Sequence, residues 1–415
     1  MAAPTLAADP RTRRVSVSST EGQAGSDSYD PSVSADGRYV TFESFASDLV
    51  ANDTNGALDV FVRDRQTGIT KRVSVSSAGS EANSYSRDPS ISADGRYVAF
   101  ESGANNLVAN DTNGKTDIFV RDHLTGLTKR VSVSSGEGQA NSHSFQPSIS
   151  ADGRHVAFMS KARDLVANDT NGALDVFVRD RREGSTRRVS ISSGEGQADS
   201  GSSYPSISAD GRYVAFESTA SDLVANDTNG ALDVFVRDRR EGTTRRMSIS
   251  SGEGQADSGS SYPSISADGR YVAFQSSASD LIADDTNGSY DVFVRDRQQG
   301  ETRRVSISSA GIEGDRSSFV PSISADGRYV AFHSAARNLV ANDTNGKADV
   351  FVRDRQQGVT RRVSLTSSGS QADERSWLPS ISADGRYVAF ESDASNLVAN
   401  DTNGRFDVFV RGPLP

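Results

Sequence analysis

The chain has 415 residues, with 45 Lys and Arg against 55 Asp and Glu, so its net charge is −10. This acidic balance argues against a nucleic-acid partner, because nonspecific nucleic-acid binding relies on clustered basic residues. Cysteine is absent, which excludes disulfide bonds and thiol chemistry. No run approaches the roughly 20 apolar residues of a membrane helix, and Met1 to Pro10 lacks the features of a signal peptide, so we expect no membrane insertion.

One segment recurs seven times along the chain. The first copy begins at Pro31 with the letters PSVSADGRYV, and the next begins 58 residues later at Pro89. The other copies follow at the same interval and begin at Pro147, Pro205, Pro263, Pro321 and Pro379. A period of this length, with four short β-type runs in each copy and no helical periodicity, is typical of a propeller blade.

The first copy shows how each unit is organised. Runs rich in Val, Ile, Phe and Thr predict strands at residues 31–34, 38–44, 59–64 and 69–76. Asp36 and Gly37 predict a tight turn between the first two strands, because this pair readily adopts positive φ angles, and residues 65–68 play the same part between the last two. Since neighbouring strands run antiparallel, the loops at 46–58 and 77–88 emerge together at the opposite end, which we call the loop face.

The two ends of the chain predict how the repeats close. All seven copies contain the first three runs, but the last copy stops after its third run, at residues 407–412. Residues 12–18, with the sequence TRRVSVS, match the fourth run TKRVSVS at residues 70–76. A ring pairs these orphan strands and removes an open edge. We therefore predict an all-β fold, a seven-bladed β-propeller with four-stranded antiparallel blades, closed by the N-terminal strand. The predicted boundaries are 1–11 for an N-terminal lead, 12–412 for the propeller and 413–415 for a tail.

The repeat PSISADGRYVAF, then DVFVRD, then TxRVS, resembles the PD40 repeat of the TolB-like, WD40-like propeller family. In that family a Ser-Pro-Asp-Gly-type hairpin precedes an Ile-Ala-Phe strand, and an Asp-Ile-Tyr-Val strand follows. The resemblance covers about residues 12–412. It implies a bacterial protein that is periplasmic or secreted and that binds a protein or peptide.

A recurring acidic motif lies between the second and third predicted strands. Every copy reads Asp-Thr-Asn-Gly-x-x-Asp, which in the first copy places Asp53, Asn55 and Asp59. Calcium prefers roughly six to eight oxygen ligands, and the motif resembles the middle of an EF-hand-like loop. The alternative is structural: Asp53 and Asn55 form Asx turns, and Asp59 caps backbone amides. The candidate calcium ligands are Asp53, Asn55, Asp59, Asp111, Asn113, Asp117, Asp169, Asn171, Asp175, Asp227, Asn229, Asp233, Asp285, Asn287, Asp291, Asp343, Asn345, Asp349, Asp401, Asn403 and Asp407.

The residues just before each repeat proline differ from copy to copy. One position of the second predicted strand also differs among the copies, and in the first copy it is Glu43. In a ring of otherwise similar units, divergence at a shared face is where an asymmetric ligand is recognised, and aromatic rings there can stack on sugars or peptide side chains. Drift at exposed positions is the alternative. The candidate ligand-binding residues are Tyr29, Arg87, Phe145, Tyr204, Tyr262, Phe319 and Trp377.

No pattern in the sequence indicates catalysis. The histidines His123, His143, His155 and His333 occupy different positions of the repeat, and neither a nucleophile elbow nor a zinc-binding helix motif occurs. We therefore expect a monomer that is not an enzyme and that binds a protein or peptide through the loop face. Two alternatives are a calcium-dependent lectin with one weak site per repeat, and a designed or recently amplified scaffold without an evolved ligand.

Overall fold

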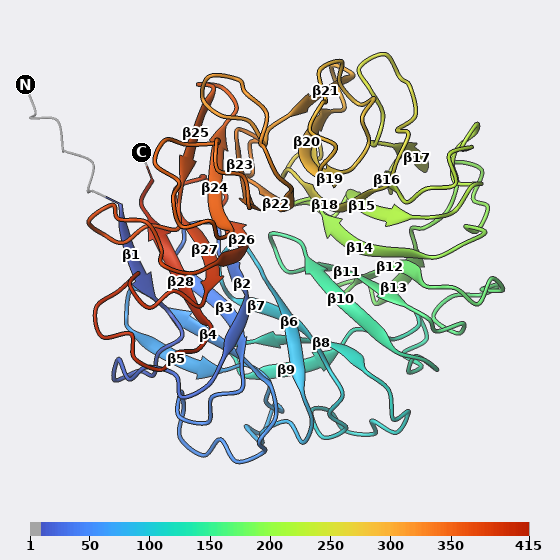
Figure 1. The fold of residues 1–415 in the computed structure, drawn as a ribbon. Coiled ribbons are helices and arrows are strands. Elements are labelled where there is room, and N and C mark those ends of the chain that lie inside the picture. The colour runs from blue at the N-terminus through green and yellow to red at the C-terminus, as the bar shows by residue number, and fades with distance from the viewer. Residues whose placement is uncertain (1–9, 415) are drawn as a thin grey trace, which may run out of the picture.

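The computed structural model describes residues 10–414, and every regular element in that range is a β-strand. Seven four-stranded antiparallel sheets follow one another in a ring (Figure 1). We number them as blades 1 to 7 in chain order. The predicted seven-bladed β-propeller is therefore confirmed. Residues 1–9 of the predicted N-terminal lead, and Pro415 of the predicted tail, lie outside the described residues.

Each blade runs from an inner strand to an outer strand. Blade 1 contains β2 (Ser28–Val33), β3 (Tyr39–Ser44), β4 (Asp59–Asp64) and β5 (Ile69–Arg72). Blades 2 to 6 contain, in the same order, β6 (Ser86–Ile91), β7 (Tyr97–Ser102), β8 (Asp117–Asp122), β9 (Leu127–Arg130), β10 (Ser144–Ile149), β11 (His155–Ser160), β12 (Asp175–Asp180), β13 (Ser185–Arg188), β14 (Ser202–Ile207), β15 (Tyr213–Ser218), β16 (Asp233–Asp238), β17 (Thr243–Arg246), β18 (Ser260–Ile265), β19 (Tyr271–Ser276), β20 (Asp291–Asp296), β21 (Glu301–Arg304), β22 (Ser318–Ile323), β23 (Tyr329–Ser334), β24 (Asp349–Asp354) and β25 (Val359–Arg362). Blade 7 contains β26 (Ser376–Ile381), β27 (Val388–Ser392), β28 (Asp407–Gly412) and, from the N-terminus, β1 (Arg11–Arg14).

The N-terminal strand completes blade 7, as the repeat predicts. β1 pairs antiparallel with β28, with Arg11 opposite Gly412 and Arg14 opposite Phe409. Figure 1 shows β1 and β28 side by side in the same blade. This pairing satisfies backbone groups of β28 that would otherwise form an open edge.

The inner strand of each blade begins earlier than the sequence predicts. In blade 1 the prediction places its start at Pro31, but β2 begins at Ser28. Ser28 and Tyr29 pair with β3, and the register then shifts before Ser32. A β-bulge at this point accommodates the proline, which has no N–H to donate to the ladder. The bulge sets the direction of the side chains at the inner end of the loop face.

The outer strand ends earlier than predicted. β5 stops at Arg72, four residues before the predicted end. The Val73 N–H still donates to the Val60 carbonyl oxygen at 2.7 Å, but Val75 forms only an isolated bridge with Glu81 in the loop. The chain after Arg72 therefore folds back toward the next blade.

Apolar side chains fill the space between neighbouring blades. Val60 and Val62 of blade 1 pack with Val98 and Phe100 of blade 2 in one buried cluster. The other six junctions hold equivalent clusters. Fully burying one such side chain stabilises the fold by roughly 1.5–3 kcal/mol, so each blade depends on its neighbours.

Hydrogen bonds also join the inner strands around the central channel. The Ile91 N–H of blade 2 donates to Ser32 Oγ of blade 1 at 3.3 Å, and the equivalent bond is present at all seven junctions. The Ala35 N–H donates to the Ala93 carbonyl oxygen at 3.0 Å, and this bond occurs at six junctions. The inner strands therefore form a rigid frame for the residues at the channel mouth.

Candidate functional site at the loop face and channel mouth

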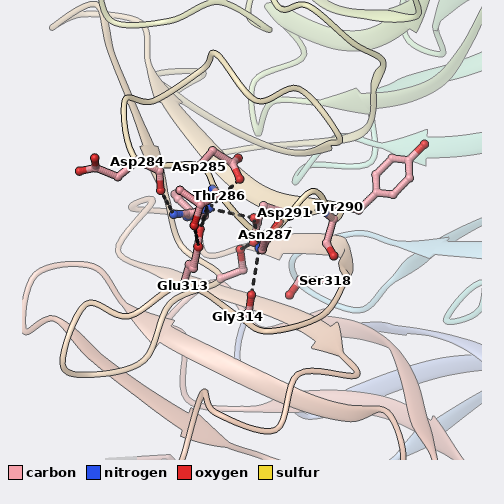
Figure 2. A network of polar contacts seen from close by, with 12 residues as sticks. Asp284, Asp285, Thr286, Asn287, Tyr290, Asp291, Glu313, Gly314 and Ser318 are labelled. Carbon is pink, nitrogen blue, oxygen red and sulfur yellow. Dashed lines mark hydrogen bonds and ion pairs between the residues drawn. The ribbon is translucent and has the colours of Figure 1, made fainter.

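The recurring acidic loops each surround a guanidinium group. In blade 5, Arg304 Nη1 at the end of β21 lies 3.1 Å from Asp285 Oδ1, 3.0 Å from Asp291 Oδ2 and 2.7 Å from Glu313 Oε2. Figure 2 shows the three carboxylates of this network close together. Every blade has this arrangement of an arginine between the two loop carboxylates. The arginines are Arg14, Arg72, Arg130, Arg188, Arg246, Arg304 and Arg362.

The loop asparagine is used by the protein itself. Asn287 Oδ1 accepts a hydrogen bond from the Ser289 N–H at 2.7 Å, which is an Asx turn. Its Nδ2 donates to Asp291 Oδ2 at 2.8 Å and to the Gly314 carbonyl oxygen at 2.9 Å (Figure 2). The structure thus brings the predicted Asp, Asn and Asp of each loop together, but with a cation of the chain between the carboxylates. This geometry supports the structural interpretation, and calcium binding stays a prediction.

Blade 5 contains a third carboxylate that the sequence reasoning missed. Ligand atoms of Asp285, Asp291 and Glu313 lie within 4.8 Å of one another. Burial raises the pKa of Asp285 and of Asp291, whereas the hydrogen bonds from Thr286 help to lower that of Glu313 against the effect of burial. Comparing the copies exposes this difference, because Glu81 and Glu313 stand where the other five carry Gln.

A cavity of about 200 Å³ lies where the inner strands meet at the loop face. The residue before each repeat proline adopts a φ between 44° and 52°, in the left-handed region that the β-bulge requires. These residues are Asp30, Asp88, Gln146, Tyr204, Tyr262, Val320 and Leu378. Five of them line the cavity, together with four of the prolines: Asp30, Asp88, Gln146, Val320 and Leu378.

The seven positions are chemically asymmetric around the ring. Blades 1 and 2 contribute carboxylates, and Gln146 Nε2 of blade 3 donates to Asp88 Oδ1 at 3.0 Å. Blades 4 and 5 contribute Tyr204 and Tyr262, whose ring centroids lie 4.6 Å apart. Blades 6 and 7 contribute the aliphatic Val320 and Leu378. One side of the channel mouth is therefore acidic and the other is aromatic and aliphatic.

The Asp30 carboxylate faces this cavity without a partner. It makes no hydrogen bond or ion pair with any residue in the range 10–414, although its N–H is bonded. Burial, followed by the nearby Asp88 carboxylate, raises the pKa of Asp30. The cation that opposes this rise is Arg87, whose Nε lies 2.6 Å from Glu101 Oε1 and 3.5 Å from Asp88 Oδ2. A single guanidinium thus lies among several carboxylates, and the remaining negative charge favours a ligand with positive charge.

Buried glutamates on the second strand of several blades accept hydrogen bonds from the backbone of the residues at the channel mouth. Glu43 Oε2 accepts a hydrogen bond from the Asp88 N–H of the next blade at 2.8 Å, and Glu391 Oε2 accepts one from the Asp30 N–H at 3.2 Å. Glu101, Glu217 and Gln275 make the same link. Burial, and next the Asp30 carboxylate, raise the pKa of Glu391 from 4.5 to about 8.

Two blades lack this link among the described residues. Met159 and His333 stand at the equivalent positions of blades 3 and 6. The Nδ1 atom of His333 has no hydrogen-bond partner in residues 10–414. Burial lowers the pKa of His333 to about 4, so this imidazole is neutral at pH 7.

The structure divides the seven predicted ligand-binding residues into two groups. Tyr204 and Tyr262 lie directly before their prolines and contact each other. The other five lie one position earlier and contact neighbouring rings instead. Their contacts are Tyr29 with Phe406 (5.5 Å between centroids), Trp377 with Phe406 (6.0 Å), Phe319 with Tyr290 (5.3 Å), Phe145 with His143 (5.8 Å) and the Arg87 guanidinium with Tyr85 (5.4 Å).

Trp377 and Tyr29 nevertheless belong to a group of aromatic side chains that contact one another. They flank Phe406, and the Arg375 guanidinium lies 4.8 Å from the Trp377 ring centroid. This aromatic group, formed by Tyr29, Trp377 and Phe406, spans the junction of blades 7 and 1. Sequence reasoning found two of its rings but missed Phe406, which belongs to the acidic loop region of the last copy.

Comparison with known proteins identifies the fold but no close relative. No protein-family profile and no curated protein matches the chain. Among solved structures, an oligogalacturonate lyase in complex with manganese has a TM-score of 0.54 at 13% identity, covering 98% of this chain and 90% of that chain. The β-propeller domain of the Trilobed protease from Pyrococcus furiosus has a TM-score of 0.53 at 13% identity, covering 98% and 94%.

Two further similar structures are longer than this chain. An acylaminoacyl peptidase from Pyrococcus horikoshii has a TM-score of 0.54 at 12% identity, covering 89% of this chain and 50% of that chain. TolB from Acinetobacter baumannii has a TM-score of 0.41 at 17% identity, covering 73% and 58%. The chain therefore spans about half of the peptidase and less than two thirds of TolB.

These neighbours correct one prediction. The sequence led us to expect that the protein is not an enzyme, but a lyase and peptidases are among the propellers that share its fold. That exclusion is therefore withdrawn. Identities of 12–17% carry the fold across and no reaction.

No helix capable of crossing a membrane occurs between residues 10 and 414. The propeller architecture implied by the repeat is confirmed, since the propeller domain of the Trilobed protease is among the similar solved structures. The chain is a seven-bladed β-propeller that shares its fold with these propeller proteins.

Proposed function

We propose that the protein binds a protein or peptide partner through the loop face, and that a Lys or Arg side chain of the partner enters the channel mouth. The observation that carries this proposal is the partnerless Asp30 carboxylate, which lines a cavity of about 200 Å³ with Asp88 beside it. A cation there would offset the cost of burying two carboxylates close together.

The size and lining of the cavity suit one long basic side chain. Its volume of about 200 Å³ is below the roughly 300–1,000 Å³ of typical small-molecule pockets. The aliphatic part of a Lys or Arg would lie against Val320 and Leu378, with its charged end near Asp30.

The aromatic group of Tyr29, Trp377 and Phe406 supports a macromolecular partner. Its rings lie at the junction of blades 7 and 1 on the loop face, where residues flanking the inserted side chain would contact them. A calcium-dependent lectin is supported less well, because its ion would compete with a guanidinium in each loop. A periplasmic or secreted location remains part of the proposal.

Selection from a displayed peptide library tests the proposal. We expect enrichment of peptides containing Lys or Arg, and at least a tenfold loss of their affinity for Asp30→Asn. Asn tolerates the φ of 46° at this position, so the change removes charge without disturbing the bulge. Glu301→Gln on the outer strand β21 is the matched control and should bind normally. Selected peptides without basic residues, or equal affinity for Asp30→Asn, would refute the proposal.

A further inference from the structure

An arginine–glutamate pair closes the outer groove between neighbouring blades at four junctions. Arg63 on β4 donates from Nη1 to the Ser18 carbonyl oxygen at 2.9 Å and from Nη2 to Glu21 in the loop before blade 1. The same pairing recurs three times. The four pairs are Arg63 with Glu21, Arg179 with Glu137, Arg237 with Glu195 and Arg295 with Glu253.

Three blades keep the arginine but carry glycine in place of the glutamate. The glycines are Gly79, Gly311 and Gly369, opposite Arg121, Arg353 and Arg411. Arg411 Nη1 still donates to Thr12 Oγ1 at 3.0 Å and to the Thr366 carbonyl oxygen at 2.9 Å. Its Nη2 contacts no carboxylate within residues 10–414. A Cβ atom added to Gly369 would meet nothing within 4 Å, so the space that glutamate fills elsewhere is open here.

The junction of blades 6 and 7 also holds a large cavity, with a volume of about 520 Å³, and both Arg411 and Gly369 line it. Two grooves of the same kind have volumes of about 440 Å³ and 320 Å³, and each is lined by its own glutamate, Glu253 or Glu21. The junction of blades 6 and 7 therefore combines more space than either of these two grooves with an arginine that lacks its acidic partner.

The walls of this cavity are mostly apolar. Tyr329, Val352 and Val363 line it on the blade 6 side, and Leu414 lines it near the C-terminus. Two charged neighbours are already paired: Asp354 with Arg328 at 2.7 Å, and Arg362 with both Asp343 and Asp349. Arg361, a third charged neighbour, is exposed to solvent and forms no ion pair within residues 10–414. Arg411 is 7% exposed, and burial lowers its pKa, as expected for a guanidinium without an anion beside it.

We propose that this cavity binds a carboxylate-bearing ligand with an apolar body, and that the ligand's carboxylate occupies the position on Arg411 that glutamate holds in four other blades. Guanidinium and carboxylate are complementary in shape and charge, and partial burial strengthens their hydrogen bonds. The apolar walls contribute the remaining affinity by removing the ligand's hydrocarbon surface from water. This site is separate from the channel mouth and does not depend on the function proposed there.

Calorimetric titration with 2-naphthoate, and with 2-naphthamide as the uncharged control, tests the site. We expect the acid to bind at least tenfold more tightly than the amide. Gly369→Glu should abolish binding of the acid, because the new carboxylate reproduces the pair found in blades 1, 3, 4 and 5. That variant is compatible with the fold, since the four natural glutamates adopt φ angles of 62° to 65° and Gly369 has a φ of 88°.

Gly311→Glu is the matched control, because it restores the same pair at Arg353, which does not line the cavity. It should leave the affinity for 2-naphthoate unchanged. Pro10 lines the cavity, and Asp9 is the acidic residue that precedes it in the sequence. The variant Asp9→Asn should also leave the affinity for 2-naphthoate unchanged. Equal binding of acid and amide, undiminished binding to Gly369→Glu, or binding that appears only in Asp9→Asn would each overturn the proposal.

Discussion

The residue before each repeat proline holds backbone strain at the channel mouth. Asp, Asn and Gly accept positive φ readily, whereas Val320 adopts a φ of 48° and Leu378 one of 44°. For ordinary L-residues this region costs roughly 1–2 kcal/mol. Because the bulge is enforced by the proline and by the neighbouring ladder, the fold imposes the conformation and leaves the side chain free to vary. The channel mouth can therefore change its chemistry without changing its shape.

Glu391 makes stability depend on pH. Its pKa is raised to about 8 in the folded state, so the folded chain binds a proton at Glu391 that the unfolded chain releases above pH 4.5. This contribution to the free energy of unfolding is fully present below about pH 4.5 and is lost as pH rises toward 8, by up to about 1.4 kcal/mol per pH unit.

Glu391→Gln should therefore be more stable than the unmodified chain at pH 8.5 and similar to it at pH 4. Gln275 shows that an amide makes the same hydrogen bond, to the Val320 N–H at 2.9 Å, so the link between blades is kept. Urea denaturation at both pH values measures the difference. An equal gain at both pH values would mean that ionisation of Glu391 is not the cause.

At the scale of strands and loops, the 58-residue repeat was enough to predict the strands, the tight turns and closure by the N-terminal strand. The repeat did not predict the bulge before Pro31. The prediction placed the start of the inner strand at this proline, whereas the proline interrupts a strand that begins at Ser28. The bulge shifts the inner register, so Asp30 rather than Tyr29 lines the channel. The arginine between the loop carboxylates was also missed, because Arg72 reaches Asp59 only once β4 and β5 are paired.

The guanidinium in each acidic loop should act as the loop's built-in cation. Arg304→Ala leaves Asp285, Asp291 and Glu313 close together without a counterion, so we expect a loss of about 3–5 kcal/mol in the free energy of unfolding. Calcium at millimolar concentration should restore part of this stability, because three carboxylates then offer oxygen ligands. The unmodified chain should not respond to calcium.

Arg246→Ala in blade 4 is the control for this prediction. There Gln255 replaces the third carboxylate, so calcium should restore less stability than in Arg304→Ala. Thermal melting with calcium and with chelator measures both variants. A rise in the melting temperature of the unmodified chain on adding calcium would instead support an ion in the natural loops.

At the scale of the whole molecule, the seven junctions are unequal. The junction of blades 4 and 5 has a Glu217 bond to the next blade, the Arg295–Glu253 pair and Arg297 stacked on Tyr213. At the junction of blades 6 and 7, His333, Gly369 and Pro413 stand at the positions of Glu217, Glu253 and Arg297. The described residues there form none of the three links. Cooperative opening of the ring should therefore begin at this junction.

Hydrogen exchange can locate this opening. Amides of the outer strand β25 in blade 6 should exchange at least tenfold faster than those of β17 in blade 4. Gly369→Glu should slow exchange in β25 by supplying one missing link, and it should leave β17 unchanged. Equal protection of the two strands in the unmodified chain would show that the missing links do not control local stability.

Because β1 and β28 share a sheet, the architecture has no first or last unit in three dimensions. The covalent order of the repeats is one of several linear orders that describe the same circle. Joining residue 414 to residue 10 by a short linker, and cutting the backbone in an exposed acidic loop, would yield a circular permutant with the same contacts. Evolution or an engineer could therefore attach a fused domain beside any blade without altering the propeller.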